Sequence, residues 1–387
     1  MRLKHLTLLA LGGCALFMAA CSSDKPKEIK PNPLPKLVNS TVTVHKLWSF
    51  RIGDGNHGRF LLLRPAVSAS QILVASSNGT LEAHDRATGK RQWRVHSHAL
   101  LSVGVDAGYG VAVMGTVDGR VLAYASKNGQ ALWTASLAST PMSEPLVTAE
   151  SVFVASNDGR LYALDRLTGK VRWSVDSSVP SLSLHGMAKP IWVNGTLVMG
   201  TGDGRLLAFN GKTGDPLWDT HVVDSQGRTE LERMNDVDGD LAVDADTLYA
   251  VSYHGGLAAI DPDNGRHRWD YRLSSWQGIG LGIGNVFVVD EDSVIEAIDV
   301  STGKSVWKQS DLRGRRLTAP VQLDGMLLVA DFQGWVHVAS ALDGHWLGRS
   351  HFYRTGGFQS PPVVDGSDIY LQSEGGRVVG LTLQKSR

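Results

Sequence analysis

The sequence of 387 residues has only two cysteines, Cys14 and Cys21, and both lie at its N-terminal end. The globular part that follows therefore contains no disulfide, no zinc site built on cysteines and no catalytic cysteine. The sequence also lacks the Gly-x-Ser-x-Gly, His-Glu-x-x-His and Walker motifs of hydrolases, metalloproteases and nucleotide-binding proteins. We expect no catalytic residue, no metal and no cofactor.

An excess of charge and long apolar runs are absent as well. The 38 Lys and Arg residues balance 38 Asp and Glu residues, so a nucleic-acid partner is not indicated. The local basic run of Arg313, Arg315 and Arg316 is interpreted as a solvated loop and not as an anion site. No segment after residue 20 approaches the ~20 apolar residues that a membrane helix needs. Glycine is abundant instead, at 43 residues, together with 11 tryptophans, which suits many tight turns between short strands.

The first 20 residues have the pattern of a secretory signal peptide. Arg2 and Lys4 precede the apolar run 6–20, which ends in small residues before Cys21. This ending resembles the lipobox of bacterial lipoproteins, in which the cysteine after the cleavage site carries the lipid. We expect lipid attachment at Cys21, and prefer it to Cys14 because cleavage there would leave a very short signal. The alternative is an ordinary cleaved signal peptide with an incidental cysteine.

Residues 21–43 are predicted to be a lipidated N-terminus and a flexible tether. The segment mixes charged residues with the run Pro31–Pro35, a composition of extended linkers that do not pack. Ser22 and Ser23 follow the cysteine, and the lipoprotein sorting rule then implies the periplasmic face of the outer membrane. Removal of residues 1–20 leaves 36 basic and 38 acidic residues.

After residue 43 the sequence repeats one unit eight times. Each unit has a turn, a strand that ends in Ala-x-Asp, a Thr-Gly or Asn-Gly turn, and usually a strand with Trp, as from Asp158 to Trp173. The turn residues 79, 119, 159, 204, 255, 293, 334 and 376 are 40, 40, 45, 51, 38, 41 and 42 apart. Apolar, β-prone segments between the turns predict four short antiparallel strands per unit.

Eight such units predict an all-β fold, an eight-bladed β-propeller over residues 44–387. One four-stranded sheet cannot bury both of its faces, so neighbouring sheets must stack, and the unit length is that of a propeller blade. The last copy lacks its outer strand, whereas the segment Val44–Trp48 carries a Trp outside any copy. We therefore expect the N-terminal strand to complete the last blade and close the ring. An open β-solenoid, the alternative, would leave both ends uncapped.

The repeated side chains are interpreted as structural. Trp recurs at one place in six copies, which favours docking between neighbouring blades over an aromatic ligand site. The repeated aspartates are expected to cap turns; they are Asp85, Asp165, Asp261 and Asp299.

Two patterns for metal binding are incomplete. His96 and His98 could share one strand face, but no third ligand is evident. Asp236–Asp240 begins like a calcium loop, yet Leu241 and Thr247 stand where that loop requires Gly and Glu.

The two longest intervals add residues after Trp173 and Trp218, in consecutive connections from an outer to an inner strand. All such connections emerge on one face of a propeller, so these two are expected to be neighbours. We expect exposed Leu182 and Leu184 in the first, beside a rim of carboxylates from the second, segment 228–238. An apolar anchor with a charged surround is typical of a protein interface. The alternative is that the leucines tuck under their own loop.

The lipobox, the eight repeats, Pro180-Ser181-Leu182-Ser183-Leu184 and Arg233-Met234-Asn235-Asp236-Val237-Asp238 together resemble the BamB family. These proteins are lipoprotein subunits of the outer-membrane β-barrel assembly machinery, the BAM complex. The resemblance implies a non-catalytic scaffold that docks on the periplasmic POTRA domains of BamA and assists delivery and insertion of unfolded β-barrel outer-membrane proteins. By position, the residues implied to contact BamA are Leu182, Leu184, His185, Asp236 and Asp238, with His185 where the family commonly has Arg.

Two other classes of function stay open. The repeat is shared with PQQ-type quinoprotein dehydrogenases, although many of those carry an adjacent cysteine pair that is absent after residue 21. The third hypothesis is a lipoprotein propeller that binds another envelope protein or a polysaccharide.

Overall fold

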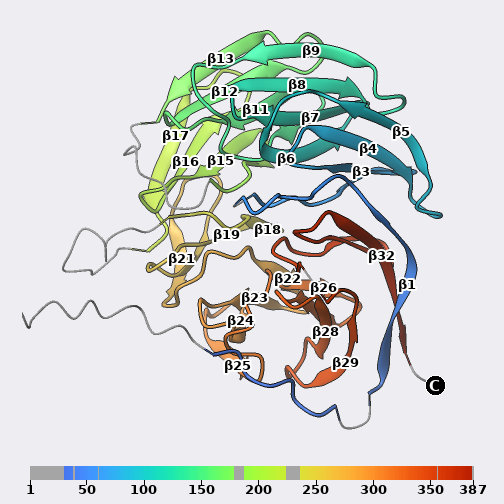
Figure 1. Ribbon diagram of the computed structural model, residues 1–387. Helices are drawn as coiled ribbons and strands as arrows, with labels where there is room; N and C mark the ends of the chain where they lie inside the picture. The colour runs from blue at the N-terminus through green and yellow to red at the C-terminus, as the bar shows by residue number, and fades with distance from the viewer. Residues whose placement is uncertain are drawn as a thin grey trace, which may run out of the picture.

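The computed structural model describes residues 30–37, 40–59, 61–177, 187–223, 236–354 and 356–385. Within these ranges the chain forms 32 β-strands joined by turns, and no helix. The described part of the chain therefore contains no helix that could cross a membrane. The strands form eight four-stranded antiparallel sheets arranged in a ring (Figure 1), so the predicted eight-bladed β-propeller is confirmed.

The blades are numbered in chain order, each from its first to its last strand in the sheet. Blade 1 is β2 (Ala66–Val67), β3 (Gln71–Ala75), β4 (Thr80–Asp85) and β5 (Arg91–His96); blade 2 is β6 (Leu101–Gly108), β7 (Val111–Thr116), β8 (Arg120–Ala125) and β9 (Ala131–Ser136). Blade 3 is β10 (Leu146–Val147), β11 (Ser151–Ala155), β12 (Arg160–Asp165) and β13 (Val171–Asp176); blade 4 is β14 (Ile191–Val193), β15 (Thr196–Gly200), β16 (Arg205–Asn210) and β17 (Pro216–His221). Blade 5 is β18 (Ala242–Asp244), β19 (Thr247–Val251), β20 (Leu257–Ile260) and β21 (His267–Tyr271); blade 6 is β22 (Gly280–Gly282), β23 (Asn285–Val289), β24 (Ile295–Asp299) and β25 (Ser305–Gln309). Blade 7 is β26 (Val321–Leu323), β27 (Met326–Ala330), β28 (Trp335–Ser340) and β29 (Trp346–His351); blade 8 is β30 (Val363–Asp365), β31 (Asp368–Gln372), β32 (Arg377–Lys385) and β1 (Val42–Arg51).

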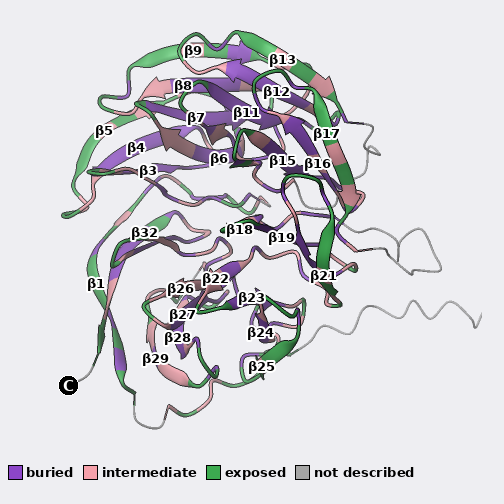
Figure 2. Ribbon diagram, turned by 180° about the vertical axis from the view of Figure 1, so that it is seen from behind, coloured by how far each residue is buried: buried purple, intermediate pink, exposed green. Residues whose placement is uncertain are grey.

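The first strand of each blade lies nearest the ring axis and the fourth lies outside. First strands of neighbouring blades contact each other; for example, β18 contacts β22, and β26 contacts β30. The two middle strands carry the core: every residue of β11 is buried, whereas the outer strand β13 alternates between exposed and half-buried residues. Figure 2 shows the same order around the ring, with purple middle strands and largely green outer strands. The apolar clusters lie between adjacent blades, which is why no blade is stable alone.

The N-terminal strand closes the ring, as the sequence predicted. β1 pairs antiparallel with β32 from Val42 opposite Lys385 to Arg51 opposite Arg377, and so supplies the outer strand of blade 8. Trp48 on β1 takes the place of the missing Trp, and its indole nitrogen donates to the carbonyl of Arg86 in blade 1 over 3.0 Å. First and last segments of the chain thus share one sheet.

The repeated tryptophans dock neighbouring blades, which confirms the structural interpretation. The indole nitrogen of Trp133 in blade 2 donates to the carbonyl of Arg166 in blade 3 over 2.8 Å. Its ring packs on Gly169, where a Cβ atom would lie 2.5 Å from the ring and φ is +70°. Only glycine accepts both the contact and the dihedral at low cost. Six more pairs repeat this contact: Trp48–Gly89, Trp93–Gly129, Trp173–Gly214, Trp218–Gly265, Trp269–Gly303 and Trp307–Gly344.

Blade 7 lacks this Trp because the following blade has no turn to receive it. Blade 8 takes its outer strand from the N-terminus, so the usual turn between third and fourth strands is missing there. The backbone of β1 passes instead, and a Cβ atom on Gly348 would lie 2.0 Å from the carbonyl oxygen of Val42. The irregular seventh repeat is thus a consequence of ring closure.

The repeated aspartates cap turns, as predicted. Oδ1 of Asp165 accepts hydrogen bonds from the amides of Leu167 and Thr168 and from the Thr168 hydroxyl. Asp299 does the same for Ser301 and Thr302. Asp85 and Asp261 accept amide bonds within their own turns.

Candidate functional site

The two enlarged connections, which run from β13 to β14 and from β17 to β18, lie side by side at their described ends. The amide of Ala188 donates to the carbonyl of Val237 over 3.2 Å, and the amide of Val237 donates to the carbonyl of Thr201 over 3.1 Å. The prediction that these connections are neighbours is confirmed for these ends. We call the face of the ring on which the outer-to-inner connections emerge the cavity face.

The predicted partner-binding residues divide into two groups. Leu182, Leu184 and His185 lie outside the described residues, as does the lipid-attachment residue Cys21. Asp236 is 1% exposed, and its carbonyl accepts the amide of Tyr253 over 3.0 Å. The expected exposed rim of carboxylates therefore does not include Asp236. The backbone hydrogen bonds of Asp236 and Val237 to Tyr253 and Thr201 hold this segment in a buried position.

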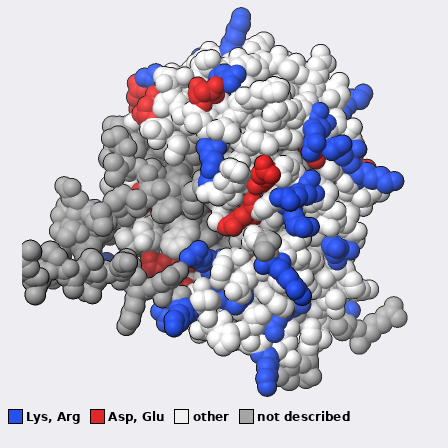
Figure 3. All heavy atoms as spheres, in the orientation of Figure 1, with Lys and Arg blue, Asp and Glu red and all other residues white. Residues whose placement is uncertain are grey.

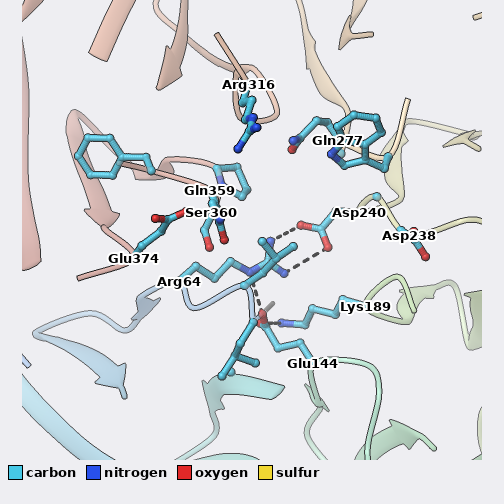
Figure 4. A pocket seen from close by; sticks show the side chains of 18 of the residues that line it. Arg64, Glu144, Lys189, Asp238, Asp240, Gln277, Arg316, Gln359, Ser360 and Glu374 are labelled. Carbon is cyan, nitrogen blue, oxygen red and sulfur yellow. Dashed lines mark hydrogen bonds and ion pairs between the residues drawn. The ribbon is translucent and has the colours of Figure 1, made fainter. Parts of the chain in front are cut away.

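Asp238 has a different place from Asp236. It is half-buried and lines a cavity on the ring axis (Figure 4). Both carboxylate oxygens of Asp238 are nevertheless buried, so in the described residues neither Asp236 nor Asp238 forms the expected exposed rim.

The axial cavity has a volume of about 560 Å³ and opens beside both long connections. Residues from both connections line it, among them Met187 and Asp238. Its wall mixes apolar groups, such as Leu62 and Phe332, with charged and amide side chains. Charges of both signs also meet near the middle of the face shown in Figure 3, while basic side chains predominate on the side of β1 and β5.

A network of ion pairs crosses the axis at the floor of this cavity. Arg64 forms an ion pair with Glu144 at 2.9 Å and a two-pronged pair with Asp240 (Figure 4). Lys189 bridges Glu144 at 3.1 Å and Asp106 at 2.8 Å. A second cavity of about 580 Å³ shares Arg64, Glu144 and Lys189 with the first. The network therefore forms a septum between two axial cavities, with three carboxylates and two cations.

The charges of the septum stabilise one another. Burial alone would lower the pKa of Lys189, but Glu144 and Asp106 outweigh it and raise that pKa above its ordinary value. Burial likewise opposes ionisation of Arg64 and Asp240. Their mutual attraction dominates, so the pKa of Arg64 is raised and that of Asp240 is lowered. The pKa directions of Arg64, Lys189 and Asp240 therefore all favour the charged forms of these three side chains at neutral pH.

Four of the five septum residues occupy one equivalent position of the repeat, which the sequence analysis did not single out, whereas Asp106 lies inside β6. Arg64, Glu144, Lys189 and Asp240 each stand two residues before the first strand of their blade. The spacing of the turn residues places this position in the eight blades at Arg64, Gly104, Glu144, Lys189, Asp240, Gly278, Ala319 and Pro361, with Gly104 inside β6 because that strand begins earlier in its blade. An alignment of the repeats would have shown alternating charges at a position next to an inner strand.

The basic run does not form a solvated loop as a whole. Arg313 is half exposed and paired with Asp292. Arg315, in contrast, is buried and donates to Asp331 over 2.6 Å. Arg316 lines the axial cavity, with its guanidinium 5.7 Å from the ring centre of Phe332. The expectation is therefore wrong for Arg315, because burial beside Asp331 satisfies its charge.

The described residues contain no group of three or more His, Cys, Asp or Glu side chains placed to hold a metal ion. His96 and His98 do lie together, with ring centres 4.6 Å apart. His96 also lies 3.2 Å from the hydroxyl of Thr80 through Nδ1.

Fold and axial site together define an eight-bladed β-propeller whose axis is crossed by ion pairs. The model of the family "Outer membrane protein assembly factor BamB" matches residues 77–309 and 292–386. An assembly factor of this name from Pseudomonas aeruginosa is 36% identical over 98% of this chain and 99% of its own length. The one from Escherichia coli K12 is 30% identical over 97% of each. The chain therefore belongs to the BamB family of outer-membrane protein assembly factors.

Solved structures agree with this assignment. The crystal structure of BamB from Moraxella catarrhalis superposes with a TM-score of 0.80 at 29% identity, over 88% of this chain and 100% of that one. A quinohemoprotein alcohol dehydrogenase from Pseudomonas putida superposes with a TM-score of 0.71 at 14% identity, over 89% and 77%. The second likeness shows a shared propeller fold alone.

Proposed function

We propose that this chain is a non-catalytic scaffold of the outer-membrane protein assembly machinery that docks on the POTRA domains of BamA through its cavity face. Membership of the BamB family supports the assembly role. The observation that carries the docking face is that two consecutive enlarged connections meet at the mouth of the axial cavity. Through BamA the scaffold joins the rest of the BAM complex and assists delivery and insertion of unfolded β-barrel proteins.

The proposed contacts are an apolar anchor from Leu182 and Leu184, flanked by His185 and Asp238. Apolar anchors supply most of the affinity in such interfaces, whereas charges at the rim mainly steer approach. Asp236 acts from beneath, by fixing the segment that presents Asp238. A lipid on Cys21 would hold the chain on the periplasmic face of the outer membrane.

The alternative quinoprotein function receives no support from the axial site. The floor of the cavity carries three carboxylates already paired with Arg64 and Lys189. The family relatives are named as assembly factors, and the dehydrogenases resemble the chain only in fold.

Affinity purification of the tagged, full-length protein from detergent-solubilised envelopes tests the docking face. We expect BamA to be retained by the wild type and lost with Leu182→Ala plus Leu184→Ala, at unchanged thermal unfolding. The control is Leu167→Ala plus Leu342→Ala, since both leucines are exposed at turns on the opposite face. Retention of BamA by the first double variant would refute the site. Retention of a different envelope protein, without BamA, would favour the third hypothesis.

A further inference from the structure

The N-terminal tether does not leave the ring where its first strand begins. Residues 30–37 have no regular secondary structure, yet they lie along the outside of blades 6 and 7. Figure 1 shows this blue segment passing β25 and β29 before it enters β1. The linker composition correctly predicts an extended chain, but part of that chain is packed.

One end of this segment is held on the cavity face. The amide of Asn32 donates to the carbonyl of Arg313 over 2.9 Å, and Nη1 of Arg315 donates to the carbonyl of Asn32 over 3.3 Å. Both arginines lie in the outer-to-inner connection from β25 to β26. Because strands alternate in direction within each blade, this connection is on the same face as the two enlarged ones.

The guanidinium that holds Asn32 is itself fixed. Arg315 is buried and paired with Asp331, and it also donates to the side chain of Gln333 over 2.6 Å. A buried cation whose orientation is set by charge-assisted hydrogen bonds is a well-ordered attachment point for a backbone carbonyl.

The middle and the other end of the segment are attached as well. Leu34 packs against the apolar cluster between blades 6 and 7, as Trp307 and Trp346 also do. At the opposite face, the Ser40 hydroxyl and the Thr41 amide donate to the carbonyl of Leu347 over 3.1 and 2.9 Å. The segment is therefore attached at both ends and in its middle, and it runs along the outside of blades 6 and 7 (Figure 1).

We infer that residues 31–37, with Ser40 and Thr41, form a strap that shortens the membrane tether and makes it leave from the cavity face beside blades 6 and 7. The inference rests on the proposed lipid at Cys21. Ten residues, 22–31, separate the lipidated cysteine from the first attached residue, Asn32, and they can span at most about 35 Å at about 3.5 Å per residue. Without the strap contacts the first attached residue would be Ser40, and the 18 residues 22–39 could span at most about 65 Å. The rim of blades 6 and 7 on the cavity face should therefore be oriented toward the lipid bilayer.

Energy transfer to a bilayer tests this orientation. The mature chain has no cysteine besides the lipidated one, so single labels can be placed by Arg272→Cys, on the cavity face of blade 5, and by Lys304→Cys, on the opposite face of blade 6. The lipidated protein is reconstituted in phosphatidylethanolamine–phosphatidylglycerol vesicles that contain a fluorescent acceptor lipid. We expect stronger transfer from position 272 than from 304, and loss of this difference in the release variant Asn32→Gly plus Leu34→Ser.

Lys36→Ser is the matched control, because Lys36 is an exposed strap residue and Leu34 and Asn32 keep their contacts. It should behave as the wild type. Equal transfer from both labels in the wild type, or no change in the release variant, would overturn the strap. Failure of the wild type to bind vesicles would refute the lipid anchor instead.

Amide hydrogen exchange tests the strap without any membrane. The backbone amide of residue 32 is bonded to the carbonyl of Arg313, so this amide should exchange slowly in the wild type and at the rate of a free peptide in the release variant. Free-peptide exchange at Asn32 in the wild type would also refute the strap.

Discussion

At the scale of single residues, the ring depends on an aromatic side chain of one blade that needs a glycine in the next. Trp133 reaches the carbonyl of Arg166 only because Gly169 has no side chain. The same pair occurs at seven blade junctions, with Gly348 replacing the Trp where the N-terminal strand passes. Each junction thus combines apolar packing with one directional hydrogen bond.

We predict that Trp133→Ala lowers the free energy of unfolding by about 3 kcal/mol, because it removes a large packed ring and leaves a carbonyl without its donor. Gly169→Ala should act in the same direction through the steric contact and the positive φ. Denaturant unfolding measures both effects.

The neighbouring Leu132→Ala serves as the control for Trp133→Ala. Leu132 is 45% exposed on the same strand and should change stability by only about 0.5 kcal/mol. Equal effects of the two alanine substitutions would show that the indole does not dock the blades.

At the scale of elements, β1 is the one strand of the described residues that pairs with a strand from the far end of the chain. Its buried side chains, Val42, Val44 and Trp48, belong to the clusters on either side of blade 8. Without β1, strand β32 would present an unpaired edge, which favours association with other chains.

Two truncations separate closure of the ring from the strap. A chain that begins at Ser40 lacks residues 31–37 but keeps β1, and we expect it to stay monomeric with a melting temperature only a few degrees lower. A chain that begins at Ile52 lacks β1 and should lose its cooperative transition and aggregate. Size-exclusion chromatography and thermal unfolding measure these outcomes. A soluble, cooperatively folded product of the second truncation would contradict closure by β1.

At the scale of the whole molecule, the septum ties together inner ends of blades that are not neighbours. Arg64 of blade 1 pairs with residues of blades 3 and 5 across the axis. Such a contact exists only once the ring is closed, so it reports on the complete propeller and not on any one blade.

We predict that Arg64→Met destabilises the protein by about 1–2 kcal/mol at pH 7, since it leaves Glu144 and Asp240 without their shared cation. Asp240 has a folded pKa below its unfolded value, so its contribution is complete above the unfolded pKa. That contribution is lost as the pH falls through the lower, folded pKa. The difference between wild type and variant should therefore shrink in acid.

Denaturant unfolding at pH 7 and near pH 3 measures this dependence. The control is Arg272→Met, a substitution of an exposed arginine outside the septum. A difference between wild type and Arg64→Met that stays constant with pH would show that the Asp240 pair does not contribute.

How far the sequence predicts this protein depends on whether a feature is repeated. Trp133, Gly169 and Asp165 recur at fixed intervals, so their structural roles follow from periodicity. The septum position also recurs in register, but it holds different residue types, among them Arg64, Glu144, Lys189 and Asp240. No single copy of the repeat therefore indicates that these side chains form ion pairs. The strap cannot be predicted, because a Pro-rich tether acquires its packing only from an apolar cluster that two folded blades form together.

The sequence by itself determined the eight blades, the closure by β1 and the family, since local turn chemistry and a constant repeat length leave few other ways to bury the strands. Only the tertiary structure decided that Asp236 is buried, that ion pairs divide the axial channel, and that the tether crosses the rim. These features depend on side chains brought together from different blades. Their separation in space is fixed by the curvature of the closed ring, which no single repeat encodes.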